Sequence, residues 1–184
     1  FITPGMMADT DVRDSRVTAR LPGSWSQYEN GGATLPLDGY ASYGLTVLHD
    51  FDGGQISFIM REIASACHLL VDGQLLYSSG NPSSNPAETI PAFVPAVVDY
   101  SLKGHRMDIV LHVANYHFIH TGPTKEIRIG KTPAIEKLQS RKQAVNLFLI
   151  GSLLTMGLYH LSLFLLRGQY EPPLYFGFFC CIIS

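Results

Sequence analysis

The chain has 184 residues, with 13 Lys and Arg against 15 Asp and Glu, a formal net charge of −2 at pH 7 and 46% hydrophobic residues. A nucleic-acid partner has no electrostatic support, because such binding rests on an excess of Lys and Arg. The three cysteines form no even set that would staple a small secreted fold, so an extracytoplasmic domain here would have to be held by its core.

The first 130 residues consist of short β-type runs separated by turn formers. In "RMDIVLHVA", Met107, Ile109 and Leu111 alternate with other residues, as a half-buried strand requires. Asp72-Gly73 between two apolar runs predicts a hairpin. The expected strands are 16–21, 40–48, 55–61, 67–71, 74–78, 94–99, 106–114 and 125–129. About eight strands without a helix predict a mainly β fold, an antiparallel jelly-roll sandwich over residues 1–131.

The sequence predicts that the chain passes from water into a membrane towards its end. Of the Asp, Glu, Lys and Arg residues, only Arg167 and Glu171 lie beyond residue 142. Thr132-Pro133 resembles a helix start, from which a juxtamembrane helical linker (132–146) continues into an apolar run. The opening "FITPGMMADTD" lacks the basic start and apolar core of a signal peptide and has no initiator Met. We therefore expect the sequence to be a piece of a longer protein.

Residues 147–167 are predicted to form a transmembrane helix. From Leu147 to Leu166 there is no Asp, Glu, Lys or Arg. Twenty helical residues span roughly 30 Å, the thickness of a bilayer's hydrocarbon core. The alternative, the core helix of a soluble protein, would normally carry a charged stripe. A second apolar run, 174–184, is expected to begin a second transmembrane helix.

The polar residues of the predicted span recur on one helix face. Ser152, Thr155, Tyr159 and Ser162 are spaced by three, four and three residues, and we expect this face to turn towards other helices of a bundle. His160 is the ionisable residue of the span and joins this bundle-facing set. It is either a functional group or a neutral imidazole hydrogen-bonded to a neighbouring helix.

The order of motifs resembles a known receptor family. "LPGSW" (21–25), "ASACHLLVDGQLLYSSG" (64–80) and "DIVLHVANYHFIHTG" (108–122) are similar to the galactose-binding-like jelly rolls of glycosidases. "FLIGSLLTMGLYHLSLFLLR" followed by "PLYFGF" (148–178) resembles the first span and the start of the second in the bacterial 7TMR-DISM receptors. Those are seven-transmembrane receptors with diverse intracellular signalling modules.

This resemblance implies an extracytoplasmic ligand-sensing domain on a multi-pass protein of the bacterial inner membrane. The output module, a kinase, cyclase or phosphatase in that family, lies outside this sequence, so the fragment itself is expected not to be an enzyme. Local charge counting (Arg141 and Lys142 before the span, Arg167 after it) would weakly place the β domain in the cytoplasm. The family topology places residues 1–146 in the periplasm or outside the cell, and the expectation follows the family.

Jelly-roll modules bind sugars on aromatic platforms with a few polar groups. We therefore expect a carbohydrate or other small polar ligand, and two groups of residues are candidates for its site. Trp25 and Tyr28 offer a stacking surface, although Trp25 alternatively closes one end of the core. The cluster "NYHFIHTG" supplies hydrogen-bonding groups, although its Asn alternatively satisfies a turn and its histidines lie on the surface. The candidates in that cluster are Asn115, Tyr116, His117 and His120.

No catalytic residue, metal site or cofactor is predicted. His112, His117 and His120 match no closed zinc site, and no carboxylate pair has a setting that separates its pKa values. Expected partners are the lipid bilayer and a small molecule, and a homodimer is kept open by analogy with other receptors. Two competing functions are a membrane-tethered carbohydrate-binding module of an enzyme and a protein-interaction ectodomain.

Overall fold

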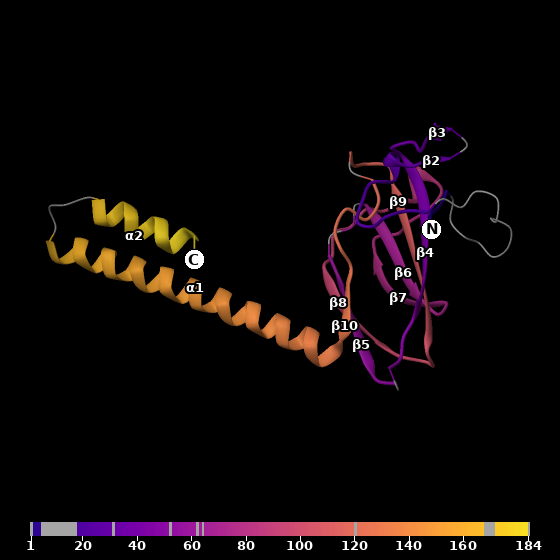
Figure 1. Ribbon diagram of the computed structural model, residues 1–184. Coiled ribbons are helices and arrows are strands. Elements are labelled where there is room, and N and C mark those ends of the chain that lie inside the picture. The colour runs from indigo at the N-terminus through magenta and orange to yellow at the C-terminus, as the bar shows by residue number, and fades with distance from the viewer. Residues whose placement is uncertain are drawn as a thin grey trace. The chain divides into compact units, whose positions relative to one another are not determined.

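The computed structural model describes residues 2–4, 18–30, 32–51, 53–61, 63, 65–119, 121–167 and 172–183. These residues form two compact units, Phe1–Thr132 and Pro133–Ser184. The first unit contains the strands and two three-residue 3-10 helices, Trp25–Gln27 and Pro86–Glu88, and the second contains two α-helices (Figure 1).

Two antiparallel sheets make up the first unit. The larger has the strand order β1-β4-β9-β6-β7 and the smaller the order β10-β5-β8, while β2 and β3 form a separate short hairpin. The bounds are β1 Ile2–Pro4, β2 Glu29–Asn30, β3 Ala33–Thr34, β4 Gly39–Leu48, β5 Gln55–Met60, β6 Ala66–Val71, β7 Gln74–Ser79, β8 Ala96–Ser101, β9 Arg106–Asn115 and β10 Arg128–Lys131. This architecture confirms the predicted antiparallel β-sandwich.

The core lies between the two sheets. Leu69, Leu111 and Val113 of the larger sheet and Phe58 and Tyr100 of the smaller one are at most 4% exposed. They follow the period of two that places alternate side chains of a strand on one face. The sequence pattern in "RMDIVLHVA" therefore predicted the inward face of β9 correctly, with Met107, Ile109 and Leu111 buried.

The hairpin predicted at Asp72-Gly73 joins β6 to β7. Asp72 and Gly73 have φ values of 48° and 77°, as the two central residues of a type I′ turn require. The Asp72 carboxylate accepts hydrogen bonds from the Tyr100 hydroxyl (2.5 Å) and from the Asp108 amide (2.8 Å). The turn is thereby attached to both sheets. Burial and this carboxylate raise the pKa of Tyr100 to about 12.

The first and last predicted strands differ from the structure. Residues 18–21 are irregular, because the amide and carbonyl of Arg20 both bond to the Tyr28 hydroxyl (2.6 and 2.7 Å) and not to a neighbouring strand. Residues 16–17 lie outside the described residues. The last strand begins at Arg128, and residues 125–127 are irregular. The strand Ile2–Pro4, which pairs with β4, and the β2–β3 hairpin were not predicted.

The second unit contains α1 (Thr132–Arg167) and α2 (Pro172–Ile183). The predicted linker and the predicted span are therefore one continuous helix, with Pro133 as its second residue. By length and composition α1 is long enough and apolar enough to cross a membrane, with a mean hydropathy of 1.8 over its apolar window. Only 6% of that window is buried by the described residues. The helix therefore does not have the surroundings of a core helix in a soluble protein.

The two helices touch through their glycines, and α2 lies alongside α1 (Figure 1). A Cβ atom on Gly157 would lie 3.0 Å from the carbonyl oxygen of Gly177 and 2.6 Å from Sγ of Cys181. The imidazole of His160 packs on the Phe176 ring at a centroid distance of 4.6 Å. Small residues thus permit close backbone approach, as is typical of membrane helix pairs.

Candidate functional site

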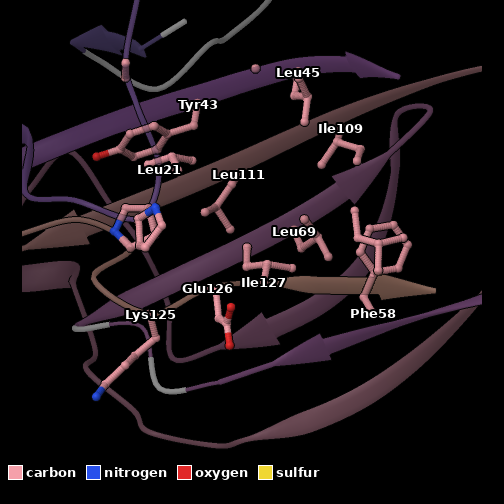
Figure 2. A pocket seen from close by; sticks show the side chains of 15 residues that line it. Leu21, Tyr43, Leu45, Phe58, Leu69, Ile109, Leu111, Lys125, Glu126 and Ile127 are labelled. Atoms are coloured by element: carbon pink, nitrogen blue, oxygen red, sulfur yellow. The ribbon is translucent and has the colours of Figure 1, made fainter. Parts of the chain in front are cut away.

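The two sheets of the sandwich have five and three strands, and a cavity lies where the smaller sheet does not cover the larger one. On one side β7 and β8 contact each other. On the other side β10 has only four residues, while β4 opposite has ten. The gap is bordered by irregular segments around Leu21 and Glu126. We call this hollow the β4–β10 cavity; Figure 2 shows it from close by.

The β4–β10 cavity has a volume of about 360 Å³ and mostly aliphatic walls. That volume is at the low end of the roughly 300–1,000 Å³ typical of small-molecule sites. Phe58, Leu69 and Leu111 form a fully buried floor, whereas Leu21 and Leu45 at the mouth are 45% and 57% exposed. The remaining lining residues are Ala19, Pro22, Tyr43, Gly44, Ile109, Pro123, Lys125, Glu126, Ile127 and Ile129.

The ring of Tyr43 forms part of the cavity wall, whereas its hydroxyl is enclosed behind that wall, against the turn at Gly122. Its side chain is 4% exposed, and its hydroxyl has no hydrogen-bond partner among the described residues. Burial raises the pKa of this phenol well above its usual range, so it stays protonated and can donate. A Cβ atom on Gly122 would lie 2.5 Å from the Tyr43 oxygen, so that turn fits the phenol only as glycine. A buried hydroxyl without a partner costs about 1–3 kcal/mol, so this phenol is retained at a cost in stability.

Two charged side chains stand at the rim of the cavity. Glu126 is neutralised by Arg128, whose Nε lies 2.7 Å from its Oε1 and whose Nη2 makes an ion pair with the same oxygen. Lys125 has no ion-pair partner among the described residues. The uncompensated charge of the rim is therefore positive.

The cavity wall continues along the chain into α1. Ile129 lines the cavity and belongs to β10, and β10 is followed by α1 without an intervening loop. The hydroxyl of Thr132, the first residue of α1, lies 2.9 Å from the hydroxyl of Ser57, which in turn lies 2.6 Å from a carboxylate oxygen of Asp99. Because a carboxylate only accepts, Ser57 donates to Asp99, and the Thr132 hydroxyl donates to Ser57. These bonds join Thr132, the last residue of the first unit, to the middle and edge strands of the smaller sheet.

The predicted aromatic platform is not formed. Trp25 is 3% exposed and belongs to the hydrophobic core, and its indole N–H donates to the carbonyl of Pro36 at 2.8 Å. The ring therefore presents no face to a ligand. Its position agrees with the alternative interpretation, that Trp25 closes one end of the core. Tyr28 is half-buried against the same core, and its hydroxyl is engaged by the backbone of Arg20.

The candidates of the 115–122 segment are placed differently from one another. Asn115 is fully buried and bonds the turn that follows it, donating to the carbonyl of Phe118 at 2.7 Å and accepting from its amide at 3.1 Å. The hydroxyl of Tyr116 donates to the carbonyl of Ser84 at 2.8 Å. His117 is exposed, and His120 lies outside the described residues. Of the candidates that the structure describes in this segment, Tyr116 and His117 are the two that a surface ligand can reach.

The hydroxyl stripe of α1 faces away from α2. Ser152, Thr155, Tyr159 and Ser162 are exposed, whereas α2 packs against Gly157 and His160. The Ser and Thr hydroxyls are satisfied within the helix, donating to carbonyls three or four residues earlier at 2.8 Å; the acceptors are Leu149, Gly151 and Leu158. Nδ1 of His160 lies 2.9 Å from the carbonyl oxygen of Met156.

The described residues offer few groups for catalysis or metal binding. They contain no group of three or more His, Cys, Asp and Glu side chains that could hold a metal ion. Cys67 is completely buried, and burial raises the pKa of its thiol to about 12, which leaves it protonated and unreactive. His112 is held by Ser42, whose hydroxyl lies 2.7 Å from Nδ1, on the outward face of the larger sheet.

Sequence reasoning missed the cavity. Its walls are the ordinary inward positions of β4 and β9, which have the same pattern whether a second sheet covers them or not. The one signal was the glycine and proline content of "TGPT" at 121–124, a turn that packs against "LPGSW" through the Gly23 amide and the Pro123 carbonyl at 3.1 Å.

Comparison with solved structures finds sandwich domains of glycoside hydrolases. The chain is similar to a GH2 β-galacturonidase from Eisenbergiella tayi bound to glycerol, with 16% identity and a TM-score of 0.50, over 71% of this chain and 22% of that one. A GH2 β-galacturonidase from the same organism bound to galacturonate gives 16% identity and 0.49, with the same coverage. A β-glucuronidase from Faecalibacterium prausnitzii gives 16% identity and 0.42, over 62% of this chain and 19% of that one.

The structure with a TM-score of 0.50 shows the β-sandwich fold and nothing further, since its identity is 16%. The chain spans about a fifth of the length of these enzymes. No protein-family model matches the sequence, and no curated protein matches it.

Proposed function

We propose that this chain is the ligand-sensing portion of a bacterial membrane receptor of the 7TMR-DISM type. In this proposal the β-sandwich lies on the extracytoplasmic side, α1 crosses the inner membrane as the first of several spans, and the output module lies outside this sequence. The observation that carries the proposal is the direct continuity of the cavity wall with the apolar helix, from Ile129 through β10 into α1.

The physical basis is differential affinity. A ligand that binds one arrangement of the cavity wall more tightly than another shifts the population of the two arrangements. The hydroxyl bonds between Thr132 and Ser57 would pass a displacement of the smaller sheet to the helix start. The apolar window of α1 has its side chains exposed, Leu147, Leu165 and Leu166 at 69–83%. A lipid environment would stabilise such a helix, whereas water would not.

The membrane part of the proposal is tested with reporter fusions. An export signal is placed ahead of the chain, and green fluorescent protein or alkaline phosphatase is joined after Arg167. We expect a membrane-bound product that is fluorescent with the first reporter and inactive with the second. A control variant with Leu154→Lys and Leu158→Lys should leave the membrane fraction, because each Lys near a helix centre costs roughly 2.5–3.5 kcal/mol. Active phosphatase after Arg167, or a soluble parent chain, would refute the proposal.

The coupling between the smaller sheet and α1 (here called the lever) is tested in the full-length receptor by inserting two glycines between Lys131 and Thr132. The insertion should abolish the dependence of output on ligand while leaving ligand binding unchanged. The matched control carries the same two glycines between Gly53 and Gly54, in the β4–β5 connection. Output that still follows the ligand after the first insertion would contradict the lever.

A second candidate function is a membrane-tethered carbohydrate-binding module. It is favoured by the fold likeness to a GH2 enzyme domain. Its site would be the surface at Tyr116 and His117, since Trp25 is buried. A thermal-shift screen of the chain against neutral sugars and uronic acids separates the two candidates. A sugar-dependent rise in Tm that is lost in His117→Ala would favour this module.

A further inference from the structure

We propose that the β4–β10 cavity binds a medium-chain aliphatic carboxylate, with its hydrocarbon tail on the leucine and isoleucine walls and its carboxylate at the rim beside Lys125. This inference rests on the proposed sensing function and adds the chemical class of the ligand. It departs from the carbohydrate expected from the sequence.

The walls decide against a sugar. Leu45, Leu69, Ile109, Leu111 and Ile127 offer no hydrogen-bonding side-chain atom. A hexose brings several hydroxyl groups, and each one buried against such a wall without a partner loses its bonds to water. A hydrocarbon tail has no such groups to satisfy, and it covers aliphatic side chains that are exposed to water at the mouth.

The charged groups lie at the rim of the cavity and the apolar side chains inside it. Lys125 and Glu126 are exposed, whereas Leu69, Ile109 and Leu111 are at most 8% exposed. In Figure 2 the Lys125 nitrogen lies at the lower left, far from Leu45 and Ile109 at the upper right. This arrangement matches a molecule with an apolar tail and one charged head that stays at the rim.

The charge of the rim determines the head group. Lys125 carries a positive charge that no described residue compensates, while Glu126 is already paired with Arg128. A carboxylate attracts this ammonium, whereas an amine would be repelled by Lys125.

The inference is tested by calorimetric titration of the full 184-residue chain in lipid nanodiscs, with empty nanodiscs as the blank. The probes are butanoate, hexanoate and octanoate, with galacturonate as a carboxylate that has a polar body. Affinity should rise about fourfold for each added methylene until the cavity is filled. Galacturonate should bind far more weakly than hexanoate. Equal affinity across the series, or galacturonate binding above octanoate, would overturn the inference.

Two variants and two controls assign the binding to this cavity. Leu45→Gln at the mouth should weaken octanoate binding several-fold, whereas Leu48→Gln on the same strand, 78% exposed and outside the cavity, should not. Tyr43→Phe should leave both binding and stability unchanged, because the lost hydroxyl is enclosed and has no partner among the described residues. Lys125→Gln should cost up to about fivefold for octanoate and nothing for octanol. Equal effects of the Leu45 and Leu48 variants would refute the site.

These titrations do not depend on the reporter fusions. Chain-length-dependent binding together with a reversed topology would leave the ligand class standing and refute the receptor proposal. The expected topology without any dependence of binding on chain length would leave the receptor proposal standing and refute the ligand class.

Discussion

The substitution Asn115→Ala tests whether this residue holds the fold or recognises a ligand. Asn115 is fully buried at the end of β9. Its side chain donates to the Phe118 carbonyl at 2.7 Å and accepts from the amides of Phe118 and His117 at 3.1 and 3.4 Å. It thus bonds three backbone groups of the turn that leads out of the central strand.

The expected cost follows from these bonds. A net hydrogen bond contributes about 0.5–1.5 kcal/mol, and a buried group left without a partner costs about 1–3 kcal/mol. The 3.4 Å bond is long and contributes little. Water reaches part of the turn because His117 and Ile119 are exposed, which limits the penalty. We expect the free energy of unfolding to fall by about 2–3 kcal/mol.

The assay is urea unfolding of the chain in nanodiscs, followed by tryptophan fluorescence. Trp25 is the sole tryptophan and is buried in the β unit, so its emission reports the unfolding of that unit alone. The matched control is His117→Ala, an exposed neighbour whose backbone amide is retained, with an expected change within about 0.5 kcal/mol. A change below about 0.5 kcal/mol for Asn115→Ala, at an unaltered denaturant slope, would refute the structural role and restore the ligand-binding interpretation.

Three further outcomes are expected. Gly122→Ala should lower the free energy of unfolding by about 2 kcal/mol in the same assay, because φ at this turn is 78° and the added Cβ would lie 2.5 Å from a buried hydroxyl oxygen. Gly157→Val should separate α1 from α2 and speed the maleimide labelling of Cys180, now 3% exposed, as resolved by mass spectrometry; unchanged labelling would contradict the helix contact. Burial and the neighbouring His68 hold the pKa of His112 below its ordinary value. The unfolded chain therefore takes up this proton first, and stability should fall as the pH drops below about 6.5 towards the folded pKa. His112→Gln should make that fall shallower.

The sequence predicted elements whose pattern is local. The Asp72-Gly73 hairpin and the strands around 40–48 and 106–114 are set by turn chemistry and by alternation, both of which are visible within ten residues. The helix from Thr132 was predicted for the same reason, since Pro133 starts it and twenty uncharged residues sustain it. The β-sandwich class followed from the number of such strands.

Features that depend on distant partners were not predictable. Arg20 could have joined a strand, but the Tyr28 hydroxyl takes both of its backbone groups. Trp25 and Asn115 are residue types that are common in sugar sites, but other parts of the fold bury both of them. The cavity arises from the difference between five strands in one sheet and three in the other, and that difference depends on a pairing order no single strand encodes.

The position of β9 has a consequence for how the domain is made. It is the last strand of the larger sheet to be synthesised, yet it lies between β4 and β6, with Tyr43 opposite Leu111 and His68 opposite His112. Until β9 has left the ribosome, β4 and β6 have no common neighbour, and neither side of the sheet can be completed. β9 ends at Asn115 and α1 begins at Thr132, 17 residues later, with β10 of the smaller sheet directly before it. The β-sandwich can therefore close only shortly before α1 is made. In the proposed receptor, a chain exported in the unfolded state would remain unfolded until the apolar helix follows it.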